Sequence, residues 1–419
     1  MIAVEGPFLA AVIARLPDPI YNLAAHGVAF AFAILIEAPV IMLLSAATAM
    51  VEDRETLIKL RRFAYGLCIA TTGVLLIVLI PSVHHWLMVD LVGLPEGVAD
   101  LTYGALWLYL PWPAAIGYRR FYQGVLVREG KTRQVAYGTI FRLAAMSAAA
   151  LAAALLLDIP GAWVGGVALS SAVVAEAIVV RFMVNDTLKT VLARVKEHDD
   201  DLRYGEILEF YYPLALTSLI GLAVHPMLTF FMGRATSPVE SLAVFPVVHA
   251  LSFVFRAIGL SYQDASIALL GDRHEHFPEL KRFGMGLGLI TTALLAVVVF
   301  TPLADVWFIT ISGLTPELAA FALLPARIIV LLPGLSVLLS FQRGILVKGK
   351  RTKPITMATA LEVGVVAIVF PAMAWGVGTV GATAAFTAFL VGRMTSTAYL
   401  WPKSGSLLRS IAGEKASSR

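Results

Sequence analysis

The sequence is poor in charge and in cysteine. Only 14% of its 419 residues are Asp, Glu, Lys or Arg, against about a quarter in soluble proteins. Hydrophobic residues make up 59%, and the mean hydropathy is +0.83. These values exclude an ordinary soluble globular protein. The single Cys68 excludes a disulfide framework and identifies no compartment.

The sequence also lacks the motifs of common enzyme chemistry. It has no P-loop, no nucleophile elbow and no His-Glu-x-x-His zinc motif. The pair His84 and His85 has no third ligand at metal-site spacing. The first apolar stretch has neither a basic start nor a cleavage site, so we expect no cleavable signal peptide. We predict no enzyme, no cofactor and no metal site.

Apolar runs of membrane-spanning length follow one another along the chain. A membrane-spanning helix needs about 20 mostly apolar residues. We predict an all-α polytopic membrane protein with about twelve transmembrane helices. The spans are expected at residues 1–17, 20–50, 63–88, 101–127, 137–157, 162–184, 207–234, 240–270, 283–308, 319–347, 355–375 and 378–402.

Lys and Arg are missing from every second connection between these spans. The basic segments are 51–62, 128–136, 185–206, 271–282, 348–354 and the tail, whereas the connections between them carry no Lys or Arg. The positive-inside rule places the basic segments in the cytoplasm. We therefore expect a multi-pass protein of the cell (plasma or inner) membrane with a cytoplasmic C-terminus.

The chain contains an internal repeat. The stretch "RFYQGVLVREGKTR" at 120–133 recurs as "SFQRGILVKGKRTK" at 340–353, with five identical residues at an offset of 220. Residues 3–54 align with 223–273 at an offset of 219, after one gap. The expected organisation is a six-helix lobe at 1–184, a cytoplasmic connector at 185–206, a second six-helix lobe at 207–402 and a cytoplasmic tail at 403–419. Six is an even number, so the lobes are expected to be parallel, around a central cleft.

Comparison of the two copies of the repeat shows that the first span is short. A full span precedes Pro226, but only six residues precede its counterpart Pro7. We expect the chain as given to begin inside a helix, either because it is truncated or because its start is assigned too late. A short first span that is native remains the alternative.

Several features resemble a known transporter superfamily. They are the parallel six-span halves, the stretch "FYYPLAL" that opens the seventh span, and the junctions "GVLVR" and "GILVK". Together they resemble the multidrug/oligosaccharidyl-lipid/polysaccharide exporter (MOP, MATE-like) superfamily. The stretch "EFYYPLALTSLIGLAVHPMLTFFMGR" is most similar to the progressive ankylosis protein family, although the short first span and short tail depart from that family. The resemblance implies export of a small organic anion such as citrate, a nucleotide or pyrophosphate.

Ionisable residues inside the spans are the candidate site residues. Each costs about 2.5–3.5 kcal/mol on insertion scales, so each needs a partner or a watery cavity. The repeat aligns Glu37 with Arg256, and it aligns Arg142 with Glu362. Glu176 falls near the counterpart of Arg393. Each lobe therefore holds a charge opposite to the one at or near the equivalent place in the other lobe.

The resemblance implies that spans 2 and 8 border the central cleft. Glu37 and Arg256 are therefore expected to pair across it and to close one face in one state. In the alternative, each ion finds a neighbour inside its own lobe. Arg181 and Arg343 lie near the cytoplasmic ends of their spans and are expected to reach the interface.

The other candidates lie at two depths. Glu5 and His225 precede the aligned prolines and could exchange protons or hold a cation; a local hydrogen bond between helices is the alternative. Nearer the cytoplasm, the expected cleft residues are Gln263, Asp264, Arg119, Arg120 and Gln123. Their basic excess suits an anionic substrate.

These observations predict a secondary active transporter that exports a small organic anion by alternating access. The alternatives are a flippase for a lipid-linked sugar or other amphipath, a cation-coupled multidrug exporter, and a membrane-embedded enzyme or assembly scaffold. Coupling to H⁺ or to Na⁺ stays open. The expected partners are the lipid bilayer and an anionic or amphipathic small molecule. We expect a monomer and no nucleic acid.

Overall fold

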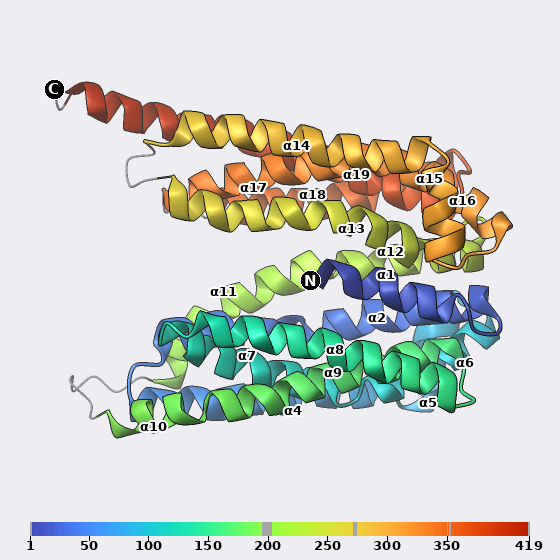
Figure 1. Cartoon of the computed structure of the whole chain (residues 1–419), viewed down its shortest axis with the longest axis horizontal. Helices are drawn as coiled ribbons and strands as arrows, with labels where there is room; N and C mark the ends of the chain where they lie inside the picture. The colour runs from blue at the N-terminus through green and yellow to red at the C-terminus, as the bar shows by residue number, and fades with distance from the viewer. Residues whose placement is uncertain (1, 195–202, 271–274, 350, 352, 418–419) are drawn as a thin grey trace. The chain divides into compact units, whose positions relative to one another are not determined.

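The structure, a computed structural model, describes residues 2–194, 203–270, 275–349, 351 and 353–417. The chain divides into two compact units, unit 1 (Met1–Phe230) and unit 2 (Phe231–Arg419). The described residues are almost entirely helical, as Figure 1 shows. Among these residues, β-type backbone pairing is limited to one isolated bridge, between Thr236 and Val380.

Unit 1 consists of helices that pack along one another. Several predicted spans are interrupted, in places near a proline, and each of these forms two consecutive helices. The elements are α1 (Ile2–Ile13), α2 (Pro19–Ile41), α3 (Leu43–Met50), α4 (Arg54–Val78), α5 (Pro81–His85), the π-helix η1 (Trp86–Leu91), α6 (Glu96–Leu108), α7 (Trp112–Arg128), α8 (Thr132–Leu156), α9 (Gly161–Met183), α10 (Asn185–Ala193) and α11 (Tyr204–Leu222). The helix α12 (Val224–Gly233) contains the boundary between the units.

Unit 2 repeats the order of the long helices α4 and α6 to α9 of unit 1 and has the single helix α13 (Pro238–Leu269) where unit 1 has α2 and α3. Its other elements are α14 (Phe277–Phe300), α15 (Leu303–Asp305), the π-helix η2 (Val306–Ile311), α16 (Pro316–Ile328), the 3₁₀-helix η3 (Ile329–Leu331), α17 (Leu332–Lys348), α18 (Lys353–Pro371), the π-helix η4 (Ala372–Gly376) and α19 (Gly381–Ser417). In each unit one pair of long helices, α8 with α9 and α18 with α19, packs along each other extensively.

Local backbone details repeat between the units. Asp18 and Ser237, each followed by proline at a helix start, are the described non-glycine residues with positive φ, at 51° and 52°. The π-helices η1 and η2 are separated by the same offset of 220 residues. A side-chain oxygen of Asn22 accepts from the backbone N–H of Ala162, and Ser241 accepts in the same way from Ala382. The repeat read from the sequence is therefore also a repeat of local structure.

Within the described residues, nine helical stretches are long and apolar enough to cross a membrane. The other three predicted spans correspond to the short α1, to α6 with α7, and to α19. The helices α6 and α7 are separated at 109–111, and α7 carries Arg119, Arg120 and Arg128. About twelve helices is consistent with this arrangement, and the predicted all-α polytopic fold class is confirmed.

The ends of two spans differ from the prediction. We expected a basic loop at 51–62, but α4 begins at Arg54 because Asp53 caps it. The Asp53 carboxylate accepts from the Thr56 N–H at 2.9 Å, and the Thr56 hydroxyl accepts from the Asp53 N–H at 3.0 Å. This reciprocal pairing satisfies free donors of the first turn. At the other end of the chain, α19 continues to Ser417, into the segment predicted as a tail.

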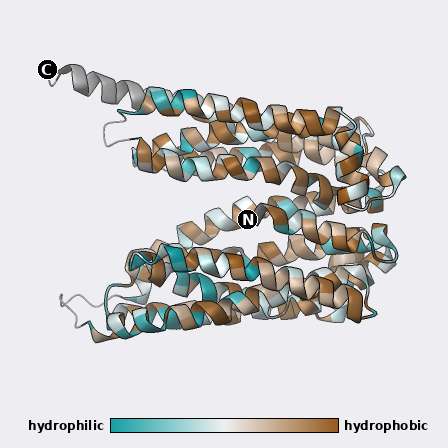
Figure 2. Ribbon diagram, in the orientation of Figure 1, coloured by the Kyte–Doolittle hydropathy of each residue, from teal (hydrophilic) through white to brown (hydrophobic). Residues whose placement is uncertain are grey.

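Apolar side chains cover much of the exterior. Leu155, Phe182 and Leu289 are 79%, 77% and 72% exposed. A soluble protein rarely exposes so many large apolar residues, whereas lipid chains solvate them. In Figure 2, the hydrophilic residues of unit 1 gather toward the end that carries α10. That helix packs on α4 and α9. Arg194, which follows it, forms a bidentate ion pair with Glu129.

Candidate functional site

Glu176 is the centre of a charged cluster inside unit 1. It lies on α9 and is 0% exposed. Arg119 Nη1 on α7 donates to Glu176 Oε2, and Gln123 Nε2, one turn further on, donates to Oε1 at 2.9 Å. Arg142 Nε on α8 lies 3.3 Å from Oε2. Both carboxylate oxygens are therefore engaged by groups from two neighbouring helices.

Arg142 joins this centre to the first helix. Its Nη2 donates to Glu5 Oε1 of α1 at 2.5 Å. Glu5 is 8% exposed, so this ion pair is also buried. The structure thus pairs Glu5 with Arg142. His225, its expected companion, lies on α12, where its carbonyl accepts from the Thr229 hydroxyl.

Glu37 is the third carboxylate of the unit 1 cluster. It lies on α2, is 7% exposed, and is close enough to Arg119, Arg120 and Arg142 to interact with their charges. Its Oε2 has no hydrogen-bond partner among the described residues, and neither does the hydroxyl of nearby Tyr109. With three arginines and three glutamates, the unit 1 cluster is formally neutral.

Unit 2 contains a second cluster, built on α18 and α19. Glu362 on α18 accepts from Arg393 on α19 at its Oε1, at 2.9 Å from Nε and 2.8 Å from Nη2. The two side chains are 11% and 12% exposed. In unit 1 the equivalent helices carry Arg142 and Glu176, so the order of the two charges along the chain is reversed between the units.

Two further arginines lie near this pair. Arg256 Nε on α13 donates to Ser336 Oγ at 3.3 Å, and its guanidinium carbon lies 5.9 Å from the centre of the Phe389 ring. Arg343 Nη2 on α17 donates to Thr359 Oγ1 at 3.2 Å. Both are close enough to Arg393 and Glu362 to interact with their charges.

The unit 2 cluster is not neutral. It holds Arg256, Arg343 and Arg393 against Glu362, a formal charge of +2 among the described residues. Buried Nη1 of Arg256 and Nε of Arg343 have no hydrogen-bond partner within the described part of the chain. Unpaired donors of this kind inside a membrane protein are costly, and they are satisfied when an anion or water binds. Nε of Arg119, Arg120 and Arg142 in unit 1 also has no hydrogen-bond partner within the described residues, so it is the excess positive charge that suits the unit 2 cluster to an added negative group.

The structure brings most of the predicted residues into these two clusters. Unit 1 collects Glu5, Glu37, Arg119, Arg120, Gln123, Arg142 and Glu176, and unit 2 collects Arg256, Glu362 and Arg393. Gln263 lies on α13 about two turns from Arg256, and the side chain of Asp264 lies outside the described residues. The pairing of Glu37 with Arg256 would join the two units, and it stays a prediction.

Arg343 is the member that sequence reasoning missed. We expected it to extend to the interface, whereas its side chain contacts Thr359 inside unit 2. A signal was present in the repeat. Arg343 is the counterpart of Gln123 at the offset of 220, and Gln123 contacts Glu176. Equivalent positions of the two units therefore both belong to a cluster.

Comparison with solved structures identifies the fold. The inward-facing conformation of a multidrug resistance MATE family transporter of the MOP superfamily matches with a TM-score of 0.77 and 13% identity, over 98% of this chain and 94% of that chain. The lipid II flippase MurJ in an inward closed conformation matches with a TM-score of 0.74 and 12% identity, over 98% and 87%. A MOP superfamily transporter from Pyrococcus furiosus, described as having reverse polarity of its binding pocket, matches at 0.59 and 13%, over 98% and 96%.

The sequence itself matches no protein-family model and no curated protein. The chain has the fold seen in MATE transporters and in MurJ, as the sequence resemblance implied. The narrower resemblance to the progressive ankylosis family stays a prediction.

Proposed function

We propose that this protein is a secondary active transporter of the MOP type that exports a small organic anion by alternating access. The observation that carries the proposal is the charge of the unit 2 cluster. Three arginines there face one carboxylate, whereas the three arginines of unit 1 face three. A substrate with one or two carboxylate or phosphate groups would bring the unit 2 cluster close to neutrality.

The chemistry of the arginines favours this class of substrate. A guanidinium presents a planar set of donors that matches a carboxylate or phosphate with two parallel hydrogen bonds. Arg256 has a free Nη1 within the described residues, while its Nε is already held by Ser336. Glu362 Oε1 accepts from both Nε and Nη2 of Arg393 and so holds that side chain in place. Arg256 and Arg343 would therefore contact the anion, and Arg393 would be oriented beside it.

Unit 1 would supply the coupling. Glu37 Oε2 is the fully buried carboxylate oxygen of the neutral cluster that has no hydrogen-bond partner among the described residues. A buried carboxylate of this kind takes up a proton or holds a cation such as Na⁺. Export driven by either gradient would then use Glu37, while the other two carboxylates stay tied to Arg119 and Arg142.

Transport into proteoliposomes tests the proposal. We would measure uptake of labelled di- and tricarboxylates, nucleotides and a cationic drug under imposed H⁺ or Na⁺ gradients. The account predicts gradient-dependent uptake of at least one anion, lost in Arg256→Gln and retained in Arg181→Gln. The Arg181 side chain contacts Asn185, the first residue of α10. Uptake of the cationic drug alone would contradict the account, as would full anion transport by Arg256→Gln.

A flippase activity is the second candidate. The likeness to MurJ, with a TM-score of 0.74, is nearly as strong as that to the MATE transporter at 0.77. An amphipath with a diphosphate group would also suit the unit 2 arginines. A reconstituted assay with a fluorescent lipid-linked sugar separates the two, because a carrier for small anions leaves that lipid in its original leaflet.

A further inference from the structure

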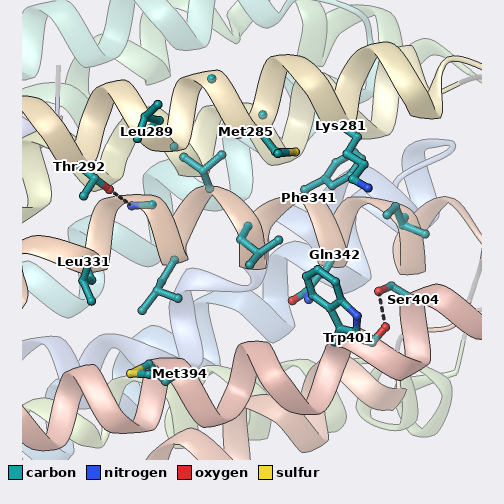
Figure 3. Close-up of a pocket in the computed structure, with 18 of the residues that line it drawn as sticks. Lys281, Met285, Leu289, Thr292, Leu331, Phe341, Gln342, Met394, Trp401 and Ser404 are labelled. Carbon is teal, nitrogen blue, oxygen red and sulfur yellow. Dashed lines mark hydrogen bonds between the residues drawn. The ribbon is translucent and has the colours of Figure 1, made fainter.

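A groove runs along unit 2, and the four charged residues of the unit 2 cluster are not among those that line it. It lies between α14, α17 and α19 and has a volume of about 860 Å³. Figure 3 shows that side chains from all three helices line it. The size is within the range of sites that hold small molecules, about 300–1,000 Å³.

Glycines create part of the groove. Gly286 and Gly288 of α14 and Gly334 of α17 line it. A Cβ added to Gly288 would lie 3.6 Å from Gly334 Cα, so the two helices approach closely there. A Cβ added to Gly286 would meet no atom within 4 Å. The space beside Gly286 is therefore open.

The groove is apolar along most of its length and polar at one end. Met285, Leu289 and Leu331 belong to the apolar part, and Lys281, Trp401 and Ser404 lie together at the other end in Figure 3. Leu289 and Trp401 are 72% and 62% exposed, so the groove opens to the outside of the unit. Trp and Lys side chains are typical of the level where lipid headgroups begin.

We propose that this groove binds one anionic phospholipid. An acyl chain lies along the apolar part, and the phosphate lies at Lys281. Charge complementarity favours an anionic lipid over a zwitterionic one, because the groove is lined by the cation of Lys281 and by none of the described carboxylates. The site is separate from the proposed substrate site, because none of the unit 2 cluster residues lines the groove.

Two pairs of variants test the proposal. Gly286→Leu fills the groove, and Gly364→Leu on α18 is its control, because Gly364 also has no atom within 4 Å of an added Cβ but lies outside the groove. Lys281→Gln removes the charge at the polar end, and Lys353→Gln at the start of α18 is its control. Leucine is a better helix former than glycine, so both glycine variants should fold.

Native mass spectrometry of the delipidated protein gives the readout. We would titrate each variant with phosphatidylglycerol or phosphatidylcholine of the same acyl chains. The expected result is one tightly held phosphatidylglycerol, weakened about fivefold by Lys281→Gln and lost in Gly286→Leu, with both controls unchanged. Equal binding of the two lipids by the wild type would overturn the proposal. So would a Gly286→Leu variant that binds phosphatidylglycerol as well as Gly364→Leu does.

Discussion

At the scale of single residues, Glu176 holds the charges of unit 1 together. It is fully buried and engages Arg119, Gln123 and Arg142 at once. If the carboxylate lost its charge, Arg119 and Arg142 would lose a buried counter-ion. A buried charge without a counter-ion is far less favourable than either a paired charge or an apolar residue. We therefore expect Glu176 to contribute mainly to the stability of the folded protein.

The substitution Glu176→Gln tests this role. Removing one partner of a buried pair lowers the free energy of unfolding by about 3–5 kcal/mol, so we expect a clear fall in the melting temperature of the detergent-purified protein. The control is Glu55→Gln, because Glu55 forms a more exposed ion pair with Lys59, and such substitutions change stability by about 0.5 kcal/mol or less. Equal melting temperatures for the two variants would show that Glu176 is not the centre described above.

At the scale of elements, two equivalent helix pairs, α8 with α9 and α18 with α19, carry the same ion pair in opposite orders. On α8 and α9 the order is Arg142 then Glu176, and on α18 and α19 it is Glu362 then Arg393. The same helix packing therefore accepts either order of the charges. The attraction between the two charges therefore does not depend on which helix carries which sign.

Exchange of the unit 2 pair follows from this. Glu362→Arg alone places four arginines together. Arg393→Glu alone replaces the arginine bonded to Glu362 with a second carboxylate, so each change should reduce the yield of folded protein strongly. The double variant keeps the net charge and reproduces the order found in unit 1, and we expect it to recover at least half of the lost yield. Yield is measured by fluorescence size-exclusion chromatography. A double variant as poor as the single ones would contradict the account.

Close helix packing is the second property at this scale. An added Cβ at Gly124 of α7 would lie 2.4 Å from the Leu44 carbonyl oxygen and 2.6 Å from Ala47 Cβ on α3. Neither contact can be relieved by rotating a long side chain, so Gly124→Ala should lower the melting temperature. Gly66→Ala on α4 is the control, since no atom lies within 4 Å of its added Cβ and alanine favours the helix by about 0.5–1 kcal/mol. A Gly124→Ala protein as stable as Gly66→Ala would contradict this packing.

At the scale of the whole molecule, the protein is a duplicated unit whose copies have diverged in charge. The backbone features at Asp18 and Ser237 and the π-helices η1 and η2 are retained in both copies. The buried charges are not retained, because unit 1 is balanced and unit 2 carries an excess of arginine. We infer that the shared backbone serves the common fold and that the differences serve binding and coupling.

The orientation predicted from the Lys and Arg counts is tested by labelling introduced cysteines. Asp158, between α8 and α9, is expected outside and Lys189 on α10 inside, and both side chains are exposed. A membrane-impermeant maleimide added to whole cells should label Asp158→Cys and not Lys189→Cys. The native Cys68 is buried and gives little background. Labelling of Lys189→Cys in intact cells would reverse the topology.

The sequence could predict the helices and the repeat because both depend on local patterns. Apolar runs, proline and the basic junctions are readable within a few tens of residues. The pairing of Glu5 with Arg142 joins residues 137 positions apart, and no local pattern indicates it. Arg343 was misread because its depth was judged from its distance to a basic loop, whereas its side chain donates to Thr359 of α18, 16 residues further along the chain. Side-chain partners between helices therefore required the structure.

Equilibrium binding to the unit 2 arginines tests the central claim most directly. We would titrate the purified protein with a tricarboxylate and with its neutral triester, and compare wild type with Arg256→Gln and Arg256→Lys. The account predicts that wild type binds the tricarboxylate and not the triester. It further predicts that Arg256→Gln weakens this binding at least tenfold and that Arg256→Lys, which keeps the charge but not the paired donors, falls between them. Equal affinity of wild type and Arg256→Gln for the tricarboxylate, or equal binding of the triester, would contradict the account.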